Sequence, residues 1–256
     1  MSRMNSCIPI ALVAALCLSS SPAGEVDKLL DVTLLKSTPE RYRWSEGSIL
    51  ALDGKQHLVM AVTGFGGGGH DHSGAEILEF HSRDGGLTWS ALEEAVVLQA
   101  NVGKQTVMNP SLLRLDTGEL LCFVSVKHSI KDCGVWVKRS SDDGQTWGGL
   151  KHLPYKGYGG VGCDRALQTS TGRIVLPAWL SMNGLGSTHA YCLYSDDRGH
   201  TWQKTALVTT PTGSTGRKTN PAAEEPMVIE LRDGRLMMFM RTYLKSIYRS
   251  FSADDG

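Results

Sequence analysis

The sequence lacks an excess of charge of either sign, because 26 lysines and arginines balance 26 aspartates and glutamates over its 256 residues. Proteins that bind nucleic acid or anionic membrane surfaces usually carry a basic excess or a basic patch, and the composition gives no indication of either partner. The six cysteines include no pair separated by two residues, the spacing typical of structural zinc sites. We therefore expect neither a metal nor a cofactor.

Long apolar runs are also scarce. The one at residues 8–18 is too short to anchor the chain across a bilayer. It follows Arg3 and precedes small residues at 20–23, which is the order of elements in a secretory signal. We expect a signal peptide over residues 1–23, a secreted or periplasmic location and no transmembrane segment.

Few cysteines remain once that signal is removed. They are Cys122, Cys133, Cys163 and Cys192. An exported protein permits disulfide bonds, and four cysteines allow three pairings. Cys122 and Cys133 could face each other across neighbouring strands, or the thiols could be buried and free.

No stretch beyond the signal shows the 3.6-residue apolar period of an amphipathic helix. The chain instead repeats a box, Ser-x-Asp-x-Gly-x-Thr-Trp, at residues 82–89, 140–147 and 195–202, and a fourth copy begins at 252–256. The copies begin 55 to 58 residues apart. A repeat near this length usually marks the blades of a β-propeller.

The box has the chemistry of a hairpin turn. Asp and Ser side chains bond nearby backbone amides, Gly supplies a positive φ, and Thr-Trp returns the chain to an extended strand. The Trp can then fill the gap between neighbouring sheets. The aspartates at 142–143 and 196–197 could bind calcium, but the box lacks the ligand density of a calcium loop. We interpret the boxes as scaffold.

Each repeat has the same order of short apolar strands, with a Gly turn after the first strand and the box after the third. This pattern predicts antiparallel blades of four strands. Residues 24–256 would then form a partial propeller domain of about four blades. The expected strands are 47–52, 57–63, 75–81 and 95–98 in the first repeat, 111–115, 120–127 and 135–139 in the second, 165–169, 174–180 and 190–194 in the third, and 227–231, 236–241 and 246–250 in the fourth.

Polar residues gather where the first strand of each repeat begins. In a propeller these positions surround one mouth of the central channel. Aligning the repeats on their turn glycines places Ser45, Asn109, Cys163 and Glu225 at one position, and Glu46, Pro110, Asp164 and Pro226 at the next. Arg241 ends the second strand of the fourth repeat and should point to the same mouth.

These features resemble the sialidase (neuraminidase) family of glycoside hydrolases. The sharpest likeness is residues 225–241, which read Glu-Pro-Met-Val-Ile-Glu-Leu-Arg-Asp-Gly-Arg-Leu-Met-Met-Phe-Met-Arg. Residues 159–177 resemble the family's third blade, and Asn109-Pro110-Ser111 resembles the start of its second. The resemblance implies an all-β fold of the six-bladed sialidase type, with about four of the blades in this chain.

The resemblance also implies an activity, the removal of terminal sialic acids from glycans with retention of configuration. The family grips the sugar carboxylate with three arginines and attacks with a Tyr that a Glu activates, while an Asp is the general acid and base. On this basis Glu225 would activate the Tyr, Asp71 would be the acid and base, and Arg241 would be one of the arginines. The Tyr and the third arginine are expected beyond residue 256.

The chain departs from the family pattern in its first repeat, where Arg-Ile-Pro is usual and Arg43-Trp44-Ser45-Glu46 stands instead. Either Arg43 or Arg41 substitutes for the usual arginine, or that arginine is absent. Glu46 would disfavour an anionic substrate unless it is paired. His70 and His72 flank Asp71 and could suggest a metal, but two histidines without a third ligand are weak evidence.

Further candidates for substrate contact are Asn109, Asp164 and Arg165. The expected partner is a sialylated glycan or another acidic carbohydrate. Two alternatives stay open: a propeller glycosidase for another acidic sugar, and a non-catalytic propeller that binds glycans.

Overall fold

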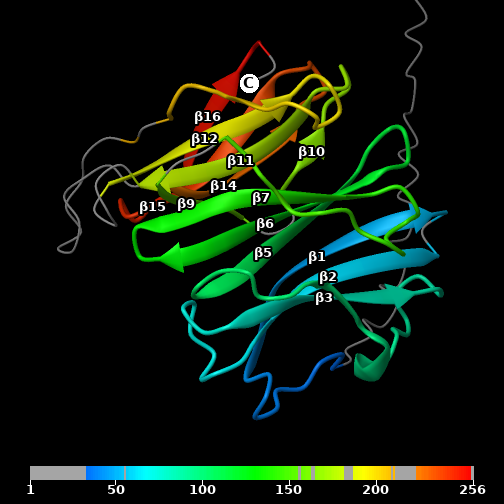
Figure 1. Cartoon of the computed structure of the whole chain (residues 1–256). Coiled ribbons are helices and arrows are strands. Elements are labelled where there is room, and N and C mark those ends of the chain that lie inside the picture. Colours follow the sequence, from blue (N-terminus) through cyan, green and yellow to red (C-terminus); the bar gives the residue numbers. More distant parts are fainter. Residues whose placement is uncertain are drawn as a thin grey trace, which may run out of the picture. The chain divides into compact units, whose positions relative to one another are not determined.

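The computed structural model describes residues 33–254, apart from residues 55, 155–156, 163–164, 182–186, 209 and 211–222 (Figure 1). The expected signal peptide, Cys163 and Asp164 lie outside the described residues. These residues belong to one compact unit that begins at Thr33. They contain sixteen strands and no α-helix, so the all-β prediction is confirmed. A single 3-10 turn, η1 (Leu92–Glu94), is the one helical element, and no helix of the described part could cross a membrane.

The strands form three sheets, and their pairings are antiparallel except for one parallel bridge. The first sheet is the first repeat: β1 (Arg43–Asp53), β2 (His57–Phe65), β3 (Ala75–Ser82) and β4 (Val96–Gln99). The second sheet holds two repeats: β5 (Thr106–Arg114), β6 (Leu120–Ser129), β7 (Asp132–Ser140) and β8 (Lys151–His152), then β9 (Tyr158–Val161), β10 (Leu167–Gln168), β11 (Ile174–Ser181), β12 (Thr188–Ser195) and β13 (Gln203–Lys204). The third is β14 (Ala223–Glu230), β15 (Leu236–Thr242) and β16 (Tyr248–Ser252).

The strands of the four repeats follow the expected order, and the number of blades stays a prediction. The first strands of the first, second and fourth repeats begin four or five residues earlier than expected. The first strand of the third repeat, expected at 165–169, is split into β9 and β10, and β9 also touches β7 through a parallel bridge between Cys133 and Tyr158. β9 reads Tyr-Gly-Gly-Val, and two glycines weaken the strand propensity of this segment.

Apolar cores join each repeat to the next. Between the first and second repeats, Val59 and Leu98 pack with Leu112 and Val124, all nearly inaccessible to solvent. Full burial of such a side chain stabilises the fold by about 1.5–3 kcal/mol. Consecutive repeats therefore hold each other together.

The described cysteines are buried free thiols, which settles one of the open alternatives for them. Cys122, Cys133 and Cys192 form no disulfide. Burial raises the pKa of Cys133 and of Cys192 to about 12, and a thiol held protonated in this way is unreactive.

The boxes are hydrogen-bonded turns, as expected. In the first, Ser82 Oγ donates to Asp84 Oδ1 at 2.8 Å and accepts from the amide of Gly86 at 2.8 Å. Thr88 donates to the same carboxylate from its hydroxyl at 2.6 Å and from its amide at 2.9 Å. These bonds lower the pKa of Asp84 to about 2, and the Thr88 hydroxyl has the largest effect. The second and third boxes repeat the pattern.

The box tryptophans fill gaps between repeats. Trp202 packs edge-on against Phe123 of the preceding repeat, with ring centroids 5.4 Å apart. Trp147 donates its indole N–H to Glu79 Oε2 of the first repeat at 2.9 Å. The prediction that the tryptophans lie between neighbouring sheets is confirmed for Trp147, whereas Trp202 lies between two repeats of one sheet.

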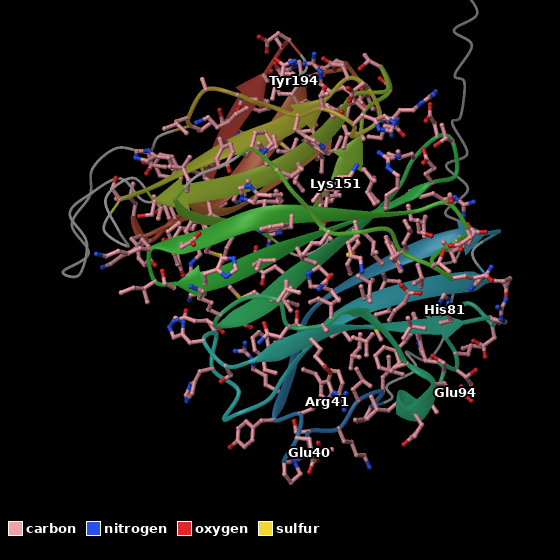
Figure 2. All side chains as sticks on the ribbon, in the orientation of Figure 1. Glu40, Arg41, His81, Glu94, Lys151 and Tyr194 are labelled. Carbon is pink, nitrogen blue, oxygen red and sulfur yellow. The ribbon has the colours of Figure 1, made fainter. Side chains whose placement is uncertain are left out.

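Glu79 is a fully buried carboxyl group within this contact. Its other oxygen lies 2.8 Å from Nε2 of His81, whose Nδ1 lies 3.1 Å from Nε2 of His57. Figure 2 labels His81 on the first sheet. One polar chain thus joins β2 and β3 to the second box.

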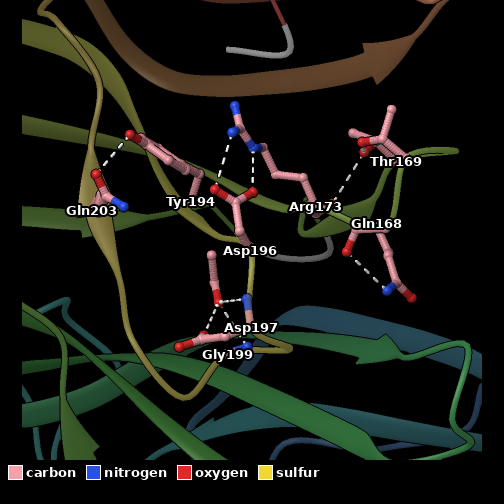
Figure 3. A network of polar contacts seen from close by, with 11 residues as sticks. Gln168, Thr169, Arg173, Tyr194, Asp196, Asp197, Gly199 and Gln203 are labelled. Atoms are coloured by element: carbon pink, nitrogen blue, oxygen red, sulfur yellow. Dashed lines mark hydrogen bonds and ion pairs between the residues drawn. The ribbon is translucent and has the colours of Figure 1, made fainter.

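A second polar network surrounds the third box (Figure 3). Arg173 grips Asp196 with two hydrogen bonds, of 2.6 and 3.1 Å, and its guanidinium lies 4.6 Å from the ring centroid of Tyr194. The Tyr194 hydroxyl donates to Gln203 at 2.9 Å. Planar bidentate pairs of this kind fix geometry strongly, so this end of the third repeat is well supported.

Candidate functional site

The antiparallel strands give the molecule two ends with different chemistry. The boxes and the turns between first and second strands lie at one end, which we call the box end. The opposite end, where each first strand begins and each second strand finishes, is the site end. The sequence-predicted site residues that the structure describes come from this end.

Three first strands carry the same β-bulge near the site end. One extra residue is accommodated between Ser45 and Ser48, between Met108 and Ser111, and between Glu224 and Met227. The bulge begins with a residue of positive φ: Glu46 at 60°, Asn109 at 60° and Glu225 at 49°.

This conformation is unfavourable for a residue with a side chain. Holding a non-glycine residue there costs roughly 1–2 kcal/mol, and Glu has less reason than Asn to adopt it. Bulges re-aim side chains beside active sites, and such strain concentrates at functional positions. The recurrence at equivalent positions in three repeats makes them the centre of the candidate site.

The bulges also correct the alignment of the first repeat. Gly54 follows Glu46 by eight residues, whereas Gly118 follows Asn109 by nine. Alignment on the turn glycines therefore placed Ser45 beside Asn109, but the structural equivalent of Asn109 and Glu225 is Glu46. The position where the family has Arg-Ile-Pro thus presents a carboxyl group.

Asp71 and Arg43 form one ion pair of the site. Asp71 lies in the loop between β2 and β3, and its Oδ1 is 2.8 Å from Nη2 of Arg43. The Arg43 guanidinium also lies 4.0 Å from the ring centroid of Phe65. Arg41 instead pairs with Glu76 at 3.3 Å. Of the two candidate arginines, Arg43 is the one that the structure brings to Asp71.

Glu225 and Arg241 form the second ion pair, with Oε1 and Nη1 2.7 Å apart. The Glu225 carboxylate raises the pKa of Arg241 further above its ordinary value. Arg165 donates to the backbone carbonyl oxygens of Glu225 and Pro226. Three sequence-predicted residues of the third and fourth repeats therefore lie together.

Glu46 connects the two pairs. The backbone N–H of Asn109 donates to its carboxyl group, and the charges of Arg43, Asp71 and Glu225 all reach it. Burial raises the pKa of Glu46 to about 6, against the opposing effect of Arg43. The Asn109 side chain donates to the carbonyl of Val161 at 2.8 Å, which ties the second repeat to the third.

Four buried polar atoms of this group have no hydrogen-bond partner among the described residues. They are Arg43 Nε, Ser45 Oγ, Glu46 Oε2 and Asn109 Oδ1. Buried polar atoms are normally paired with protein, water or ligand. Their concentration here indicates a place where polar groups of a ligand could be satisfied.

Lys127 was missed by the sequence analysis. It is almost fully buried at the site end of β6, with Nζ 2.5 Å from Nδ1 of His72 and 5.3 Å from the ring centroid of Tyr158. Burial lowers the pKa of Lys127, although the Asp71 charge acts in the opposite direction. A lysine that ends a strand of apolar residues was the signal available in the sequence. Lys127 supports the loop that carries Asp71.

Glu224 was missed as well. It accepts hydrogen bonds from the hydroxyl groups of Tyr243 at 3.0 Å and Thr188 at 3.2 Å. The position of Glu224 directly before the bulge is not marked by any separate pattern in the sequence. As for a metal at His70 and His72, no group of three His, Cys, Asp or Glu residues within the described part could hold one. Asp164 lies outside the described residues.

Comparison with known proteins identifies the repeat. A family model described as a BNR repeat-like domain matches residues 61–256. Among solved structures, a protein of unknown function from Dyadobacter fermentans is 20% identical, with a TM-score of 0.68 over 86% of this chain and 68% of its own. A Hadza microbial sialidase is 17% identical, with a TM-score of 0.69 over 85% of this chain and 46% of its own. Trypanosoma rangeli sialidase is 18% identical, with a TM-score of 0.65 over 83% and 36%.

Proposed function

Because the chain belongs to the family of BNR repeat-like domains and has the fold of sialidases, we propose that it is part of an exported glycoside hydrolase that removes terminal sialic acids from glycans. The chain spans less than half the length of both sialidases compared above. The proposal therefore concerns the whole protein, and it places the reaction at the site end described here.

One observation carries the proposal. The residues that the family resemblance assigns to catalysis and anion binding, far apart in sequence, form two ion pairs linked through Glu46: Arg43 with Asp71 and Arg241 with Glu225. A group of charged residues that also holds unpartnered buried atoms is typical of a functional site.

Each residue has a definite task in the proposed reaction. Asp71 gives its proton to the leaving glycosidic oxygen and later takes one from water. Glu225 accepts the proton of a Tyr nucleophile supplied by the whole protein. Arg241 binds the sugar carboxylate.

We also propose that the repeats are blades of a six-bladed propeller. The sheet of β14–β16 supports this, because one of its faces packs on the third repeat and the other carries exposed apolar side chains. These are Met227, Ile229, Phe239 and Phe251, each 37–46% exposed. A further repeat packed on that face would bury them, as the cores between the described repeats do. Export through the signal at residues 1–23 is part of the same proposal.

The test is hydrolysis of two sialosides that differ in leaving group, a sialyllactose and an aryl sialoside. Asp71→Asn should lower kcat on sialyllactose by about 10²–10⁴-fold and on the aryl sialoside much less, because a good leaving group needs little acid catalysis. Glu225→Gln should lower kcat on both. Asp132→Asn, an exposed change at the first residue of β7, is the matched control. No hydrolysis of either substrate by the folded parent would overturn the proposal.

A second candidate function is favoured by one observation. Glu46 stands at the bulge of the first repeat, and Arg43 and Arg241 are already paired with carboxylates. This arrangement also suits a propeller that cleaves another acidic sugar or binds a glycan without cleaving it. Binding of sialosides without turnover would support the binding role.

A further inference from the structure

Groups from its own strand and from three other elements of the site end surround Glu46. Arg43 lies on its own strand, the backbone N–H of Asn109 on β5 donates to its carboxyl group, and the charges of Asp71 and Glu225 reach it from the β2–β3 loop and from β14. The bulge and the positive φ of 60° fix its backbone. Its side chain is therefore positioned rather than free in solvent.

One oxygen of this carboxyl group is unused. Oε2 is buried and has no hydrogen-bond partner among the described residues. A buried polar atom without a partner is unfavourable by about 1–3 kcal/mol. A ligand that bonds to Oε2 recovers this energy, so the atom favours binding at this position.

The charges around Glu46 decide what kind of group can bind there. The neighbouring arginines already face carboxylates, Arg43 facing Asp71 at 2.8 Å and Arg241 facing Glu225 at 2.7 Å. An anionic group placed against Arg43 also meets Glu46. The ionised Glu46 repels that anion, whereas the protonated form can donate its O–H to it.

We propose that Glu46 is a specificity-determining residue that couples the binding of an acidic sugar to its own protonation. The inference rests on the proposed function, since it concerns the ligand of the same site. The protonated carboxyl group donates a hydrogen bond from Oε2 to the sugar carboxylate, and the ionised group excludes it. Acidic sugars then bind well in mildly acidic solution and poorly above neutral pH.

Other titratable groups face the same region. Asp71 contacts Arg43 directly, and behind it His72 meets the buried ammonium group of Lys127. His70 lies in the same loop. Burial raises the pKa of Glu46 to about 6, which places its proton change between pH 5 and pH 8. A Glu46 variant separates its contribution from that of the histidines.

The test is calorimetric binding of N-acetylneuraminic acid and of its uncharged methyl ester at pH 5 and pH 8. The parent should bind the acid about tenfold or more weakly at pH 8, which corresponds to one unit of pKa change on binding, and should bind the ester equally at both. Glu46→Gln should bind the acid equally at both pH values. Glu93→Gln, an exposed change on η1, should behave as the parent, and circular dichroism checks that each variant is folded.

Two results would overturn the inference: equal binding of the acid by the parent at both pH values, or the parent's pH dependence retained in Glu46→Gln. Glucuronic acid separates this inference from the proposed function. If it binds with a pH dependence that Glu46→Gln removes, while N-acetylneuraminic acid does not bind, the role of Glu46 stands and sialic acid is rejected as the ligand. Failure of both acids to bind overturns both.

Discussion

The two ends of the repeats are built by opposite rules. At the box end, one turn recurs with the same hydrogen bonds, and the Asp carboxylates are occupied by Ser and Thr of their own box. At the site end, the equivalent positions hold different residues, Glu46, Asn109 and Glu225, on a shared strained bulge. Four buried polar atoms of the group around Glu46 have no partner among the described residues. The box end is organised for folding, whereas the site end keeps bonding capacity for a ligand.

This difference between the two ends explains why the backbone strain of the bulges is found at the site end. A turn that satisfies its own polar atoms gains stability in every repeat. A bulge that aims Glu46 at Asp71 and Glu225 brings like charges together, which stabilises nothing by itself. Such an arrangement persists only where the surrounding structure imposes it, here through the apolar cores between repeats.

The largest expected difference in stability between the two ends concerns Glu79, near the box end. Glu79→Ala removes a fully buried carboxyl group and leaves Nε2 of His81 and the indole N–H of Trp147 without their hydrogen-bond partner. The expected loss in the free energy of unfolding is about 3–5 kcal/mol, measured by urea denaturation. Glu225→Ala, which breaks a half-exposed pair at the site end, should lose less than about 1 kcal/mol. Equal losses would refute the distinction between the two ends.

The next test follows the pH dependence of stability. The pKa of Glu46 is raised from 4.5 to about 6, so the folded state holds this proton more tightly than the unfolded state. The stabilisation is complete below about pH 4.5 and is lost as the pH rises through 6. Glu46→Gln cannot ionise. It should therefore be about 2 kcal/mol more stable than the parent at pH 8 and equal to it at pH 4.

Urea unfolding of both proteins across this pH range measures the effect. Asp84→Asn in the first box should show the opposite sign, because its pKa is lowered to about 2 by hydrogen bonds from Thr88 and Ser82. That variant is expected to be less stable than the parent at neutral pH. A Glu46→Gln variant with no pH-dependent gain would show that the buried carboxyl group is not strained in the folded protein.

A smaller effect distinguishes two buried serines. Ser140 Oγ donates to Asp142 and accepts from the amide of Gly144, whereas Ser181 Oγ at the site end has no partner in the described part of the chain. Ser140→Ala should therefore lower the free energy of unfolding by about 1–3 kcal/mol, whereas Ser181→Ala should leave it unchanged or raise it. The same urea measurement checks both, and a larger loss for Ser181→Ala would contradict the comparison.

Features that recur in every repeat were predictable from the sequence, whereas features that differ between repeats were not. Boxes and alternating strands depend on local preferences, so both were visible, and the second and third strands of each repeat lie close to their expected bounds. The split first strand of the third repeat was missed because glycines obscure β9. The equivalence of Glu46 with Glu225 was missed because Gly54 follows Glu46 by eight residues, whereas Gly234 follows Glu225 by nine.

The candidate site shows the same limit. A family resemblance pointed to Asp71, but the pairing of Asp71 with Arg43 depends on how a loop folds back over 28 residues of sequence. The burial of Lys127 against His72 joins two different repeats. No local pattern encodes such contacts, because they arise only when the repeats pack.

The smallest expected effect concerns backbone strain at both ends. Arg198 in the third box has a φ of 58°, and Gly85 occupies the same position in the first box with a φ of 72°. Arg198→Gly should therefore raise the free energy of unfolding by less than about 1 kcal/mol, since relief of the left-handed conformation exceeds the entropy that glycine adds to the unfolded chain. Glu225→Gly relieves a φ of 49°. Its free energy of unfolding should rise by a similar amount once the contribution of the lost ion pair with Arg241 has been allowed for.

Hydrolysis or sialoside binding then separates the two glycine variants. Arg198→Gly should leave function unchanged, because its strain belongs to a turn that glycine already serves in the first box. Glu225→Gly should lose function while keeping or gaining stability, which is the trade-off expected of a strained functional residue. If Glu225→Gly lowers stability instead, the bulge is held by its side chain, and the strain at the site end has a structural purpose as well.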